Sequence, residues 1–186
     1  MKRALAFLAI ALLLIVAAGA LSATRACAHD PRFACSPRDS GHPIVITEPE
    51  KSWAFYGRLG AGEEDRYEIE TPHAVAVPVQ LLVDQRDAGN AARPVAAVAD
   101  PSGRAVATMD LSRMQPFFEP FSRVTYLESP ERVIGFPAGR STITVTMHGG
   151  ELRQRYTLAI GADERFSIWE MPYLTGAVYR IHTRSF

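Results

Sequence analysis

Two runs in the last third of the chain alternate hydrophobic and polar residues at every second position. The hydrophobic positions are Ile143, Val145 and Met147 in the first run and Tyr156, Leu158 and Ile160 in the second. Alternation in β-branched and aromatic residues is typical of strands that bury one face. Because His148-Gly149-Gly150 reads as a turn, residues 140–160 are predicted to form a β-hairpin.

A hairpin alone is only marginally stable in water, so this one requires further strands. The chain offers short β-prone runs at 44–46, 51–59, 66–70, 75–83, 94–99, 105–109, 123–127 and 133–136. Turn signals separate them at spacings of about 8–12 residues, as in sandwiches and barrels. Asp100-Pro101-Ser102-Gly103-Arg104 is one predicted turn, and Pro78 favours an edge strand or a bulge. We predict an all-β fold, an antiparallel, jelly-roll-like β-sandwich of about eight or nine strands.

An aromatic segment interrupts the strand series at 111–121. Its two prolines argue against regular pairing, and Phe117, Phe118 and Phe121 stand within five residues of one another. We expect this loop to fold over one end of the core. The alternative is an exposed patch that binds a partner.

The C-terminal segment, 167–186, has the pattern of a short amphipathic helix. Leu174, Val178 and Ile181 are spaced by four and three residues, and Trp169 precedes them. The helix is predicted to dock on the sandwich, to lie on a membrane surface, or to contact a partner protein.

The N-terminal residues, 1–28, have the form of a secretory signal peptide, with a basic start and a long apolar run. Cleavage after Ala28 fits best, retention as a membrane anchor comes second, and cleavage after Ala23 is the third reading. An extended arm at 29–43 and the sandwich at 44–166 are expected to follow. Cys27 and Cys35 can form a disulfide only if Cys27 is retained.

Charge and motifs exclude several function classes. Lys and Arg together number 20, as do Asp and Glu, so no basic footprint for nucleic acid is present. The sequence has no G-x-S-x-G, H-E-x-x-H, phosphate loop or C-x-x-C. The adjacent carboxylates Glu63, Glu64 and Asp65 are expected to be solvated in a turn. We therefore predict that the protein is not an enzyme.

One metal hypothesis follows from the predicted cleavage. A chain that begins at His29 offers an amine and an imidazole nitrogen to one metal, as in the histidine brace of exported copper proteins. A second imidazole would complete the site. His148 is the first candidate, and the others are His42, His73 and His182, with Met147 as a soft additional ligand.

The strand motifs resemble a known family. S-W-A-F-Y-G-R-L, E-E-D-R-Y-E-I-E, D-P-S-G-R, P-A-G-R-S-T-I-T-V and R-Y-T-L-A-I-G are similar to the motifs of the bacterial pre-peptidase C-terminal domain. The resemblance covers about residues 44–161. It implies a β-sandwich of exported proteins that accompanies an enzyme and is not itself catalytic.

A second resemblance is to a family of exported bacterial proteins that begin with A-H-x-P. Those motifs are Ala28-His29-Asp30-Pro31, Glu119-Pro120-Phe121 and the stretch 160–166 here. This resemblance implies export and no activity. We expect a non-catalytic exported binding or accessory module, a subunit of an envelope or membrane complex. The alternative is a copper-binding protein that uses His29. The expected partner contacts are Phe117, Phe118, Phe121, Trp169, Leu174, Val178 and Ile181.

Overall fold

The protein is described by a computed structural model that covers residues 29–34, 42–89, 93–120, 122–150, 152–165 and 171–186. The predicted signal peptide, Cys27, Cys35, Phe121 and Trp169 lie outside these residues. Within them, none of the helices has both the length and the apolar character that crossing a membrane requires.

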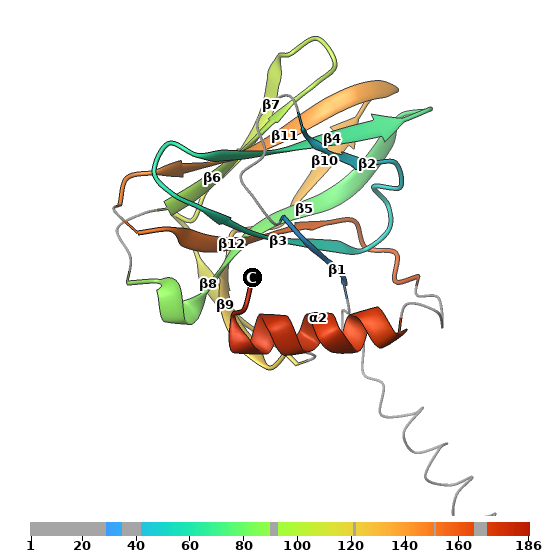
Figure 1. Cartoon of the computed structure of the whole chain (residues 1–186). Helices are drawn as coiled ribbons and strands as arrows, with labels where there is room; N and C mark the ends of the chain where they lie inside the picture. The colour runs from blue at the N-terminus through green and yellow to red at the C-terminus, as the bar shows by residue number, and fades with distance from the viewer. Residues whose placement is uncertain (1–28, 35–41, 90–92, 121, 151, 166–170) are drawn as a thin grey trace, which may run out of the picture.

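Two β-sheets face each other and form a sandwich (Figure 1). Sheet A runs in the order β1 (Asp30–Phe33), β3 (Trp53–Leu59), β12 (Gln154–Ile160), β5 (Val75–Asp84), β9 (Val124–Glu128) and β8 (Gln115–Glu119), and β10 (Arg132–Phe136) also pairs with β5. Sheet B runs in the order β2 (Ile44–Ile46), β4 (Glu64–Thr71), β11 (Gly139–His148), β6 (Arg93–Ala99) and β7 (Ala105–Met109). The short 3-10 helix η1 (Gln85–Asp87) follows β5, and α2 (Met171–Thr183) lies near the C-terminus. The predicted all-β sandwich with a C-terminal helix is therefore confirmed.

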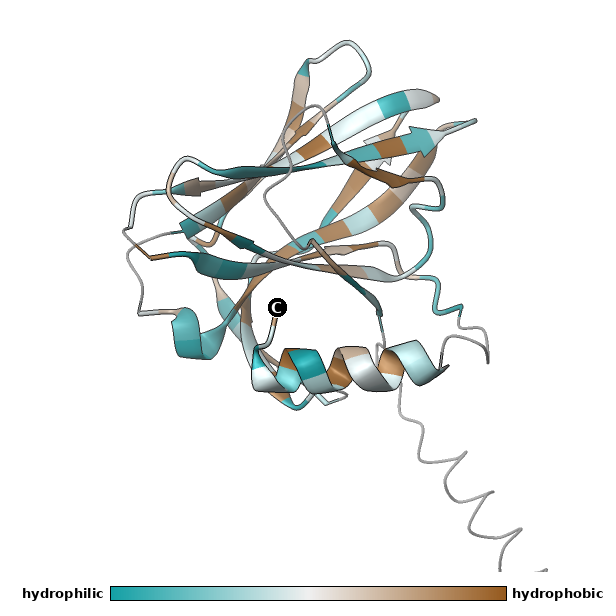
Figure 2. Ribbon diagram, viewed as in Figure 1, coloured by the Kyte–Doolittle hydropathy of each residue, from teal (hydrophilic) through white to brown (hydrophobic). Residues whose placement is uncertain are grey.

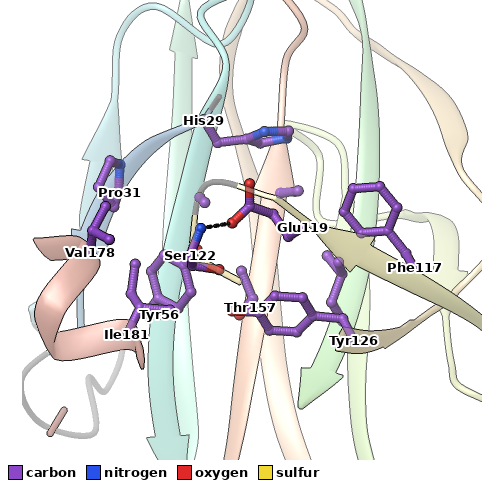
Figure 3. Close-up of a pocket in the computed structure, with 13 residues that line it drawn as sticks. His29, Pro31, Tyr56, Phe117, Glu119, Ser122, Tyr126, Thr157, Val178 and Ile181 are labelled. Atoms are coloured by element: carbon purple, nitrogen blue, oxygen red, sulfur yellow. Dashed lines mark hydrogen bonds between the residues drawn. The ribbon is translucent and has the colours of Figure 1, made fainter. Parts of the chain in front are cut away.

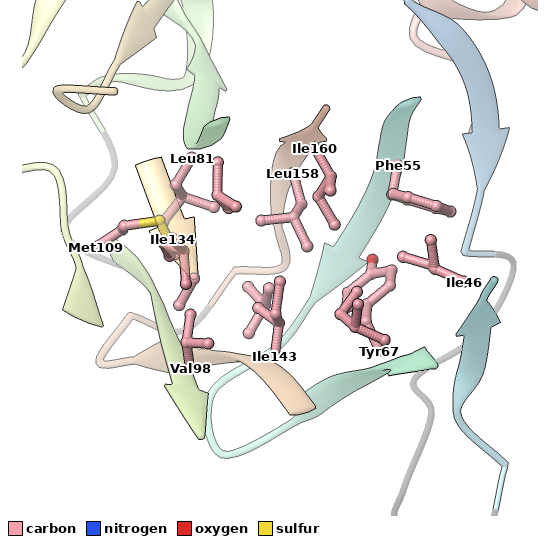
Figure 4. Close-up of a cluster of buried hydrophobic side chains, with 14 of the residues drawn as sticks. Ile46, Phe55, Tyr67, Leu81, Val98, Met109, Ile134, Ile143, Leu158 and Ile160 are labelled. Carbon is pink, nitrogen blue, oxygen red and sulfur yellow. The ribbon is translucent and has the colours of Figure 1, made fainter. Parts of the chain in front are cut away.

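The core lies between the sheets because each strand alternates its side chains. Hydrophobic and hydrophilic residues follow one another along the strands in Figure 2. Ile143 of sheet B and Leu158 and Leu81 of sheet A are fully buried. Figure 4 shows such side chains from both sheets pointing toward one another. The burial of this apolar surface is the main stabilising contribution to the fold.

The predicted hairpin at 140–160 is wrong. β11 pairs with β4 and β6 in sheet B, whereas β12 pairs with β3 and β5 in sheet A. The chain crosses from one sheet to the other after Gly149 and Gly150, which both have positive φ. The alternating residues of the two strands thus face each other across the core and do not pair edge to edge.

The structure has more strands than predicted. Among the described residues, twelve strands are present in place of about eight or nine. The segment predicted to be irregular contains β8, which pairs with β9. Pro116 is tolerated there because β8 lies at the edge of sheet A, where one side of the strand needs no ladder hydrogen bonds.

The predicted extended arm also contributes a strand, because β1 pairs with β3. This pair and the β2–β4 pair are parallel. The prediction was an antiparallel sandwich, and these two edge pairs depart from it. The turn predicted at 100–104 is confirmed: it joins β6 and β7, and the Gly103 N–H donates to the Asp100 carbonyl oxygen at 2.9 Å.

A polar pair crosses the core at the start of β4. Asp65 was expected to be solvated, but it is 1% exposed and accepts a hydrogen bond from the Tyr156 hydroxyl at 2.5 Å. The Tyr67 hydroxyl lies 2.7 Å from that of Tyr156. Asp65 is thus a structural partner of a core tyrosine, and burial raises the pKa of Tyr156 well above its usual value.

Candidate functional site

The outer face of sheet A is covered in part by α2 (Figure 1). Leu174, Ala177 and Ile181, at helical spacing, are all buried. Ile181 joins an apolar cluster with residues of the strands beneath it: Ala54, Tyr56, Leu82, Val124, Tyr126 and Ala159. Of the three predicted roles for the helix, docking on the sandwich is the one seen here.

The residues after α2 attach the C-terminus to the same face. The Phe186 ring lies 5.7 Å from the ring of Phe33 and 5.5 Å from that of Tyr56, between centroids. Arg184 pairs with Asp87 beyond the end of β5. These contacts fix the helix at its C-terminal end.

A hollow remains beside the helix, and we name it the α2 hollow. Its inner part, of about 50 Å³, lies next to Val178 and Ile181 (Figure 3). The other residues that line this part are His29, Pro31, Ala54, Tyr56, Leu82, Phe117, Glu119, Ser122, Tyr126, Thr157 and Ala159. Most of these side chains are apolar, which is usual for ligand pockets.

An outer part, of about 290 Å³, continues the hollow along the sheet. The two parts share a wall made by His29, Leu82, Phe117 and Ala159. Three carboxylates, from Glu128, Glu131 and Glu164, line the outer part. Neither part is lined by a lysine or an arginine among the described residues, so the hollow carries negative charge.

The polar groups of the inner part centre on Ser122. Its backbone N–H donates to Glu119 Oε2 at 2.6 Å, and its carbonyl oxygen accepts from His182 Nδ1 at 3.2 Å. Ser122 is 2% exposed, and its side chain lies beside the Tyr126 hydroxyl.

Two tyrosines complete the inner part. Burial raises the pKa of Tyr126 to about 12, and burial together with the neighbouring Tyr126 raises the pKa of Tyr56 well above its usual value. Both hydroxyls therefore stay protonated at neutral pH and are able to donate or accept hydrogen bonds.

The structure brings together residues that the sequence assigned to different roles. His29, proposed as a metal ligand, lines the hollow with Phe117, Val178 and Ile181, proposed as partner contacts. Leu174 is buried in α2. Phe118 is 56% exposed and does not line the hollow.

The other proposed metal ligands do not line the hollow, although His182 contacts the Ser122 carbonyl oxygen from outside it. His148 ends β11 in sheet B, where its Nε2 is 3.2 Å from Thr146 Oγ1, and Met147 is buried in the core. His42 precedes β2, and His73 lies in the turn after β4. No other histidine lines the hollow with His29. The described residues contain no group of three or more His, Cys, Asp or Glu side chains that could hold a metal ion.

Several residues of the hollow were not identified from the sequence. Tyr56, Tyr126 and Ser122 belong to no motif, and Glu119 was noted only within E-P-F. One signal was available: β3 is apolar on both faces, with Ala54 and Tyr56 opposite Phe55, as expected of a strand covered on both sides.

A second hollow, of about 520 Å³, lies between the edge strands β1 and β2 and α2. Two cations line it. Arg32 pairs with Asp30 at 2.9 Å and lies over the Trp53 ring at 5.1 Å and the Tyr173 ring at 5.3 Å. Arg180 lies over the Phe33 ring at 4.0 Å. Because both cations contact side chains of β1 or its neighbours, this hollow is part of the attachment of β1 and α2. We place the candidate site in the α2 hollow.

Comparison with known proteins gives structural matches only. Neither a family model nor a curated protein sequence matches the chain. The pre-peptidase C-terminal domain of a collagenase from Bacillus anthracis matches with a TM-score of 0.39 and 12% identity, over 72% of this chain and 96% of that domain. A family 35 carbohydrate-binding module from Clostridium thermocellum matches with a TM-score of 0.35 and 15% identity, over 63% of this chain and 98% of the module. The first is the kind of domain that the strand motifs resemble.

Proposed function

We propose that the protein is an exported, non-catalytic binding module that holds a segment of an envelope or membrane-complex partner in the α2 hollow. The observation that carries the proposal is the hollow itself, which a docked helix bounds and apolar side chains line. Such concave sites with a few polar groups are where proteins bind ligands.

The polar groups of the hollow support binding in preference to acyl transfer. A catalytic serine needs a base within hydrogen-bond reach of its Oγ. His182 contacts the carbonyl oxygen of Ser122 instead, so it is not placed as a base for the Ser122 hydroxyl. The balanced net charge supports a protein partner over nucleic acid.

Two neighbouring phenylalanines give a matched test. Phe117 lines both parts of the hollow, whereas Phe118, the next residue of β8, lines neither. We expect Phe117→Ser to reduce co-purification of partner proteins from the native envelope fraction about tenfold, because it removes a large apolar contact of the site. Phe118→Ser makes the same chemical change and should leave co-purification unchanged. Thermal unfolding of both variants controls for loss of fold. Equal recovery of partners with both folded variants would contradict the proposal.

A further inference from the structure

Lys51 differs from the other basic residues of this chain in its type and in its burial. Lys2 and Lys51 are the only lysines among the 20 lysines and arginines, so every other one of these residues is an arginine. The Lys51 side chain is 10% exposed, although arginine is the cation that suits a buried ion pair better. Lysine differs from arginine in carrying an amine that becomes a nucleophile when it loses its proton. The buried position therefore holds the one kind of basic side chain that readily forms an amide bond.

This amine contacts a carboxylate that is buried more deeply still. Lys51 Nζ lies 2.7 Å from Asp30 Oδ2, and the Asp30 side chain is 1% exposed. The backbone fixes both residues: the Asp30 N–H donates to the Ser52 carbonyl oxygen at 2.7 Å, and the Lys51 N–H donates to that of Glu48 at 3.2 Å. The Trp53 ring covers Nζ, with 4.4 Å between Nζ and the ring centroid. Two reactive groups held in contact away from water have a very high effective concentration.

The two carboxylate oxygens of Asp30 have different surroundings. Oδ2 accepts from Lys51 Nζ and from Arg32 Nη2, the latter at 2.9 Å. Oδ1 is buried and has no hydrogen-bond partner among the described residues. A buried carboxylate oxygen without a donor costs free energy and needs a physical explanation. A reaction that removes Oδ1 would remove this cost.

The geometry points to an amide bond between Lys51 and Asp30, which forms with loss of water. A proton moves from the ammonium to the carboxylate, and this transfer removes two buried charges. The amine then attacks Asp30 Cγ: the Nζ–Cγ bond forms, the Cγ–Oδ1 bond breaks, and Oδ1 leaves as water with two of the three ammonium hydrogens. Arg32 stabilises the negative charge that develops on Oδ2, which remains as the amide oxygen. The reaction needs no oxidant, reductant or second molecule.

The amide bond would secure the first strand of the sandwich. β1 has four residues, lies at the edge of sheet A and pairs with β3. A short strand at an edge opens more readily than a central one. Asp30 and Lys51 are 21 positions apart in the sequence, so the bond closes a loop that contains β1 and β2 and restricts the unfolded chain. This inference is independent of partner binding in the α2 hollow.

The test is intact mass spectrometry of the protein, purified from its native envelope and denatured. We expect a mass that is one water, about 18 Da, below the mass of the sequence from the N-terminus that is found. Trypsin should fail to cut after Lys51, because its amine is acylated. The digest should contain a branched peptide that joins the segment with Asp30 to the segment with Lys51. A chain with the full sequence mass and a free Lys51 amine would overturn the proposal.

Two variants locate the loss of water. Lys51→Arg keeps a positive charge beside Asp30 but has no amine, and Asp30→Ala removes the carboxylate. Both variants should show the full mass of their sequence. A loss of water that persists in either variant arises elsewhere in the chain and would overturn the assignment to this pair.

A third variant tests the part assigned to Arg32. Arg32→Gln removes the positive charge beside Asp30 Oδ2 and leaves both reacting groups in place. In protein collected shortly after its synthesis is induced, the linked fraction of this variant should be at least about tenfold lower than that of wild type. An equal linked fraction in the two proteins would overturn the stabilisation of Oδ2 by Arg32.

Discussion

At the scale of single residues, Gly161 is a position that only glycine fits. Its φ is +78°, and a Cβ there would meet the Lys51 carbonyl oxygen and lie 2.5 Å from that of Pro49. The backbone comes this close because the Ala162 and Asp163 N–H groups both donate to the Glu50 carbonyl oxygen. This packing holds the end of β12 against the segment that enters β3.

We expect Gly161→Ala to lower the free energy of unfolding by about 3 kcal/mol or more, because the alanine strains the backbone and displaces its neighbours. Gly176→Ala is the matched control. It lies in α2, where an added Cβ would meet no atom within 4 Å apart from the backbone of its own helix and its chain neighbours. It should raise the free energy of unfolding by up to about 1 kcal/mol through helix propensity. Urea denaturation measures both changes, and similar effects of the two variants would contradict the assignment.

The raised pKa of Tyr126 makes the free energy of unfolding depend on pH. Burial raises its pKa in the folded protein to about 12, from 10 when unfolded. The unfolded chain therefore loses this proton first as the pH rises. The contribution of the protonated Tyr126 hydroxyl to the free energy of unfolding is complete below pH 10 and is lost between pH 10 and 12. The expected loss at pH 11 is about 1.4 kcal/mol. Tyr56 and Tyr156 add losses of the same sign.

The check is urea denaturation of wild type and Tyr126→Phe at pH 8 and pH 11. The variant lacks one titrating group, so its loss of stability between the two pH values should be smaller by about 1.4 kcal/mol. An equal loss in both proteins would show that Tyr126 titrates normally.

Single residues also show where prediction from the sequence ends. The alternation in β4 places Tyr67 and Ile69 on the buried face, and the same rule places Asp65 there. We expected Asp65 in solvent because a carboxylate is costly to bury, and its partner Tyr156 is 91 residues away in the sequence. The hydroxyls of the α2 hollow were missed for the same reason, because the residues that surround them are far away in the sequence.

At the scale of elements, α2 and the residues after it form one docked unit. The buried stripe of α2 packs on sheet A, and Phe186 continues that contact against Phe33 and Tyr56. Arg155 also lies over the Phe186 ring, at 5.7 Å. Phe186 therefore supports Tyr56, which lines the hollow.

We expect Phe186→Ala to lower the free energy of unfolding by about 2 kcal/mol, because it removes two aromatic contacts and part of an apolar cluster. Tyr179→Ala on the same helix removes a side chain that is 69% exposed. Its effect should stay within about 0.5 kcal/mol. Thermal or urea unfolding compares the two. A larger effect at position 179 than at position 186 would mean that the helix docks by another face.

Elements were predicted better than their pairing. Period-two alternation located most strands, because burial of one face depends on local sequence. It does not say which strand pairs with which, so β11 and β12 were assigned to one hairpin although they lie in different sheets. β8 was missed because its proline argues against a strand unless the strand is known to lie at an edge.

At the scale of the whole molecule, the sandwich provides a rigid support and the C-terminal helix turns one sheet face into a concave site. The net charge of the whole chain is zero, yet the side chains around the hollow are acidic. The composition could not reveal this local charge, because Glu128 and Glu131 are neighbours in the sequence but Glu164 comes from a distant segment that the fold brings beside them.

The most direct test of the binding site is photo-cross-linking in the native envelope. A photoreactive amino acid replaces Ala162, which is exposed and lines the outer part of the hollow, or Val106, which is 43% exposed on β7 in sheet B. We predict a defined cross-linked product with a partner protein from position 162 and none from position 106. Products of the same kind from both positions, or none from position 162, would contradict a partner site in the α2 hollow.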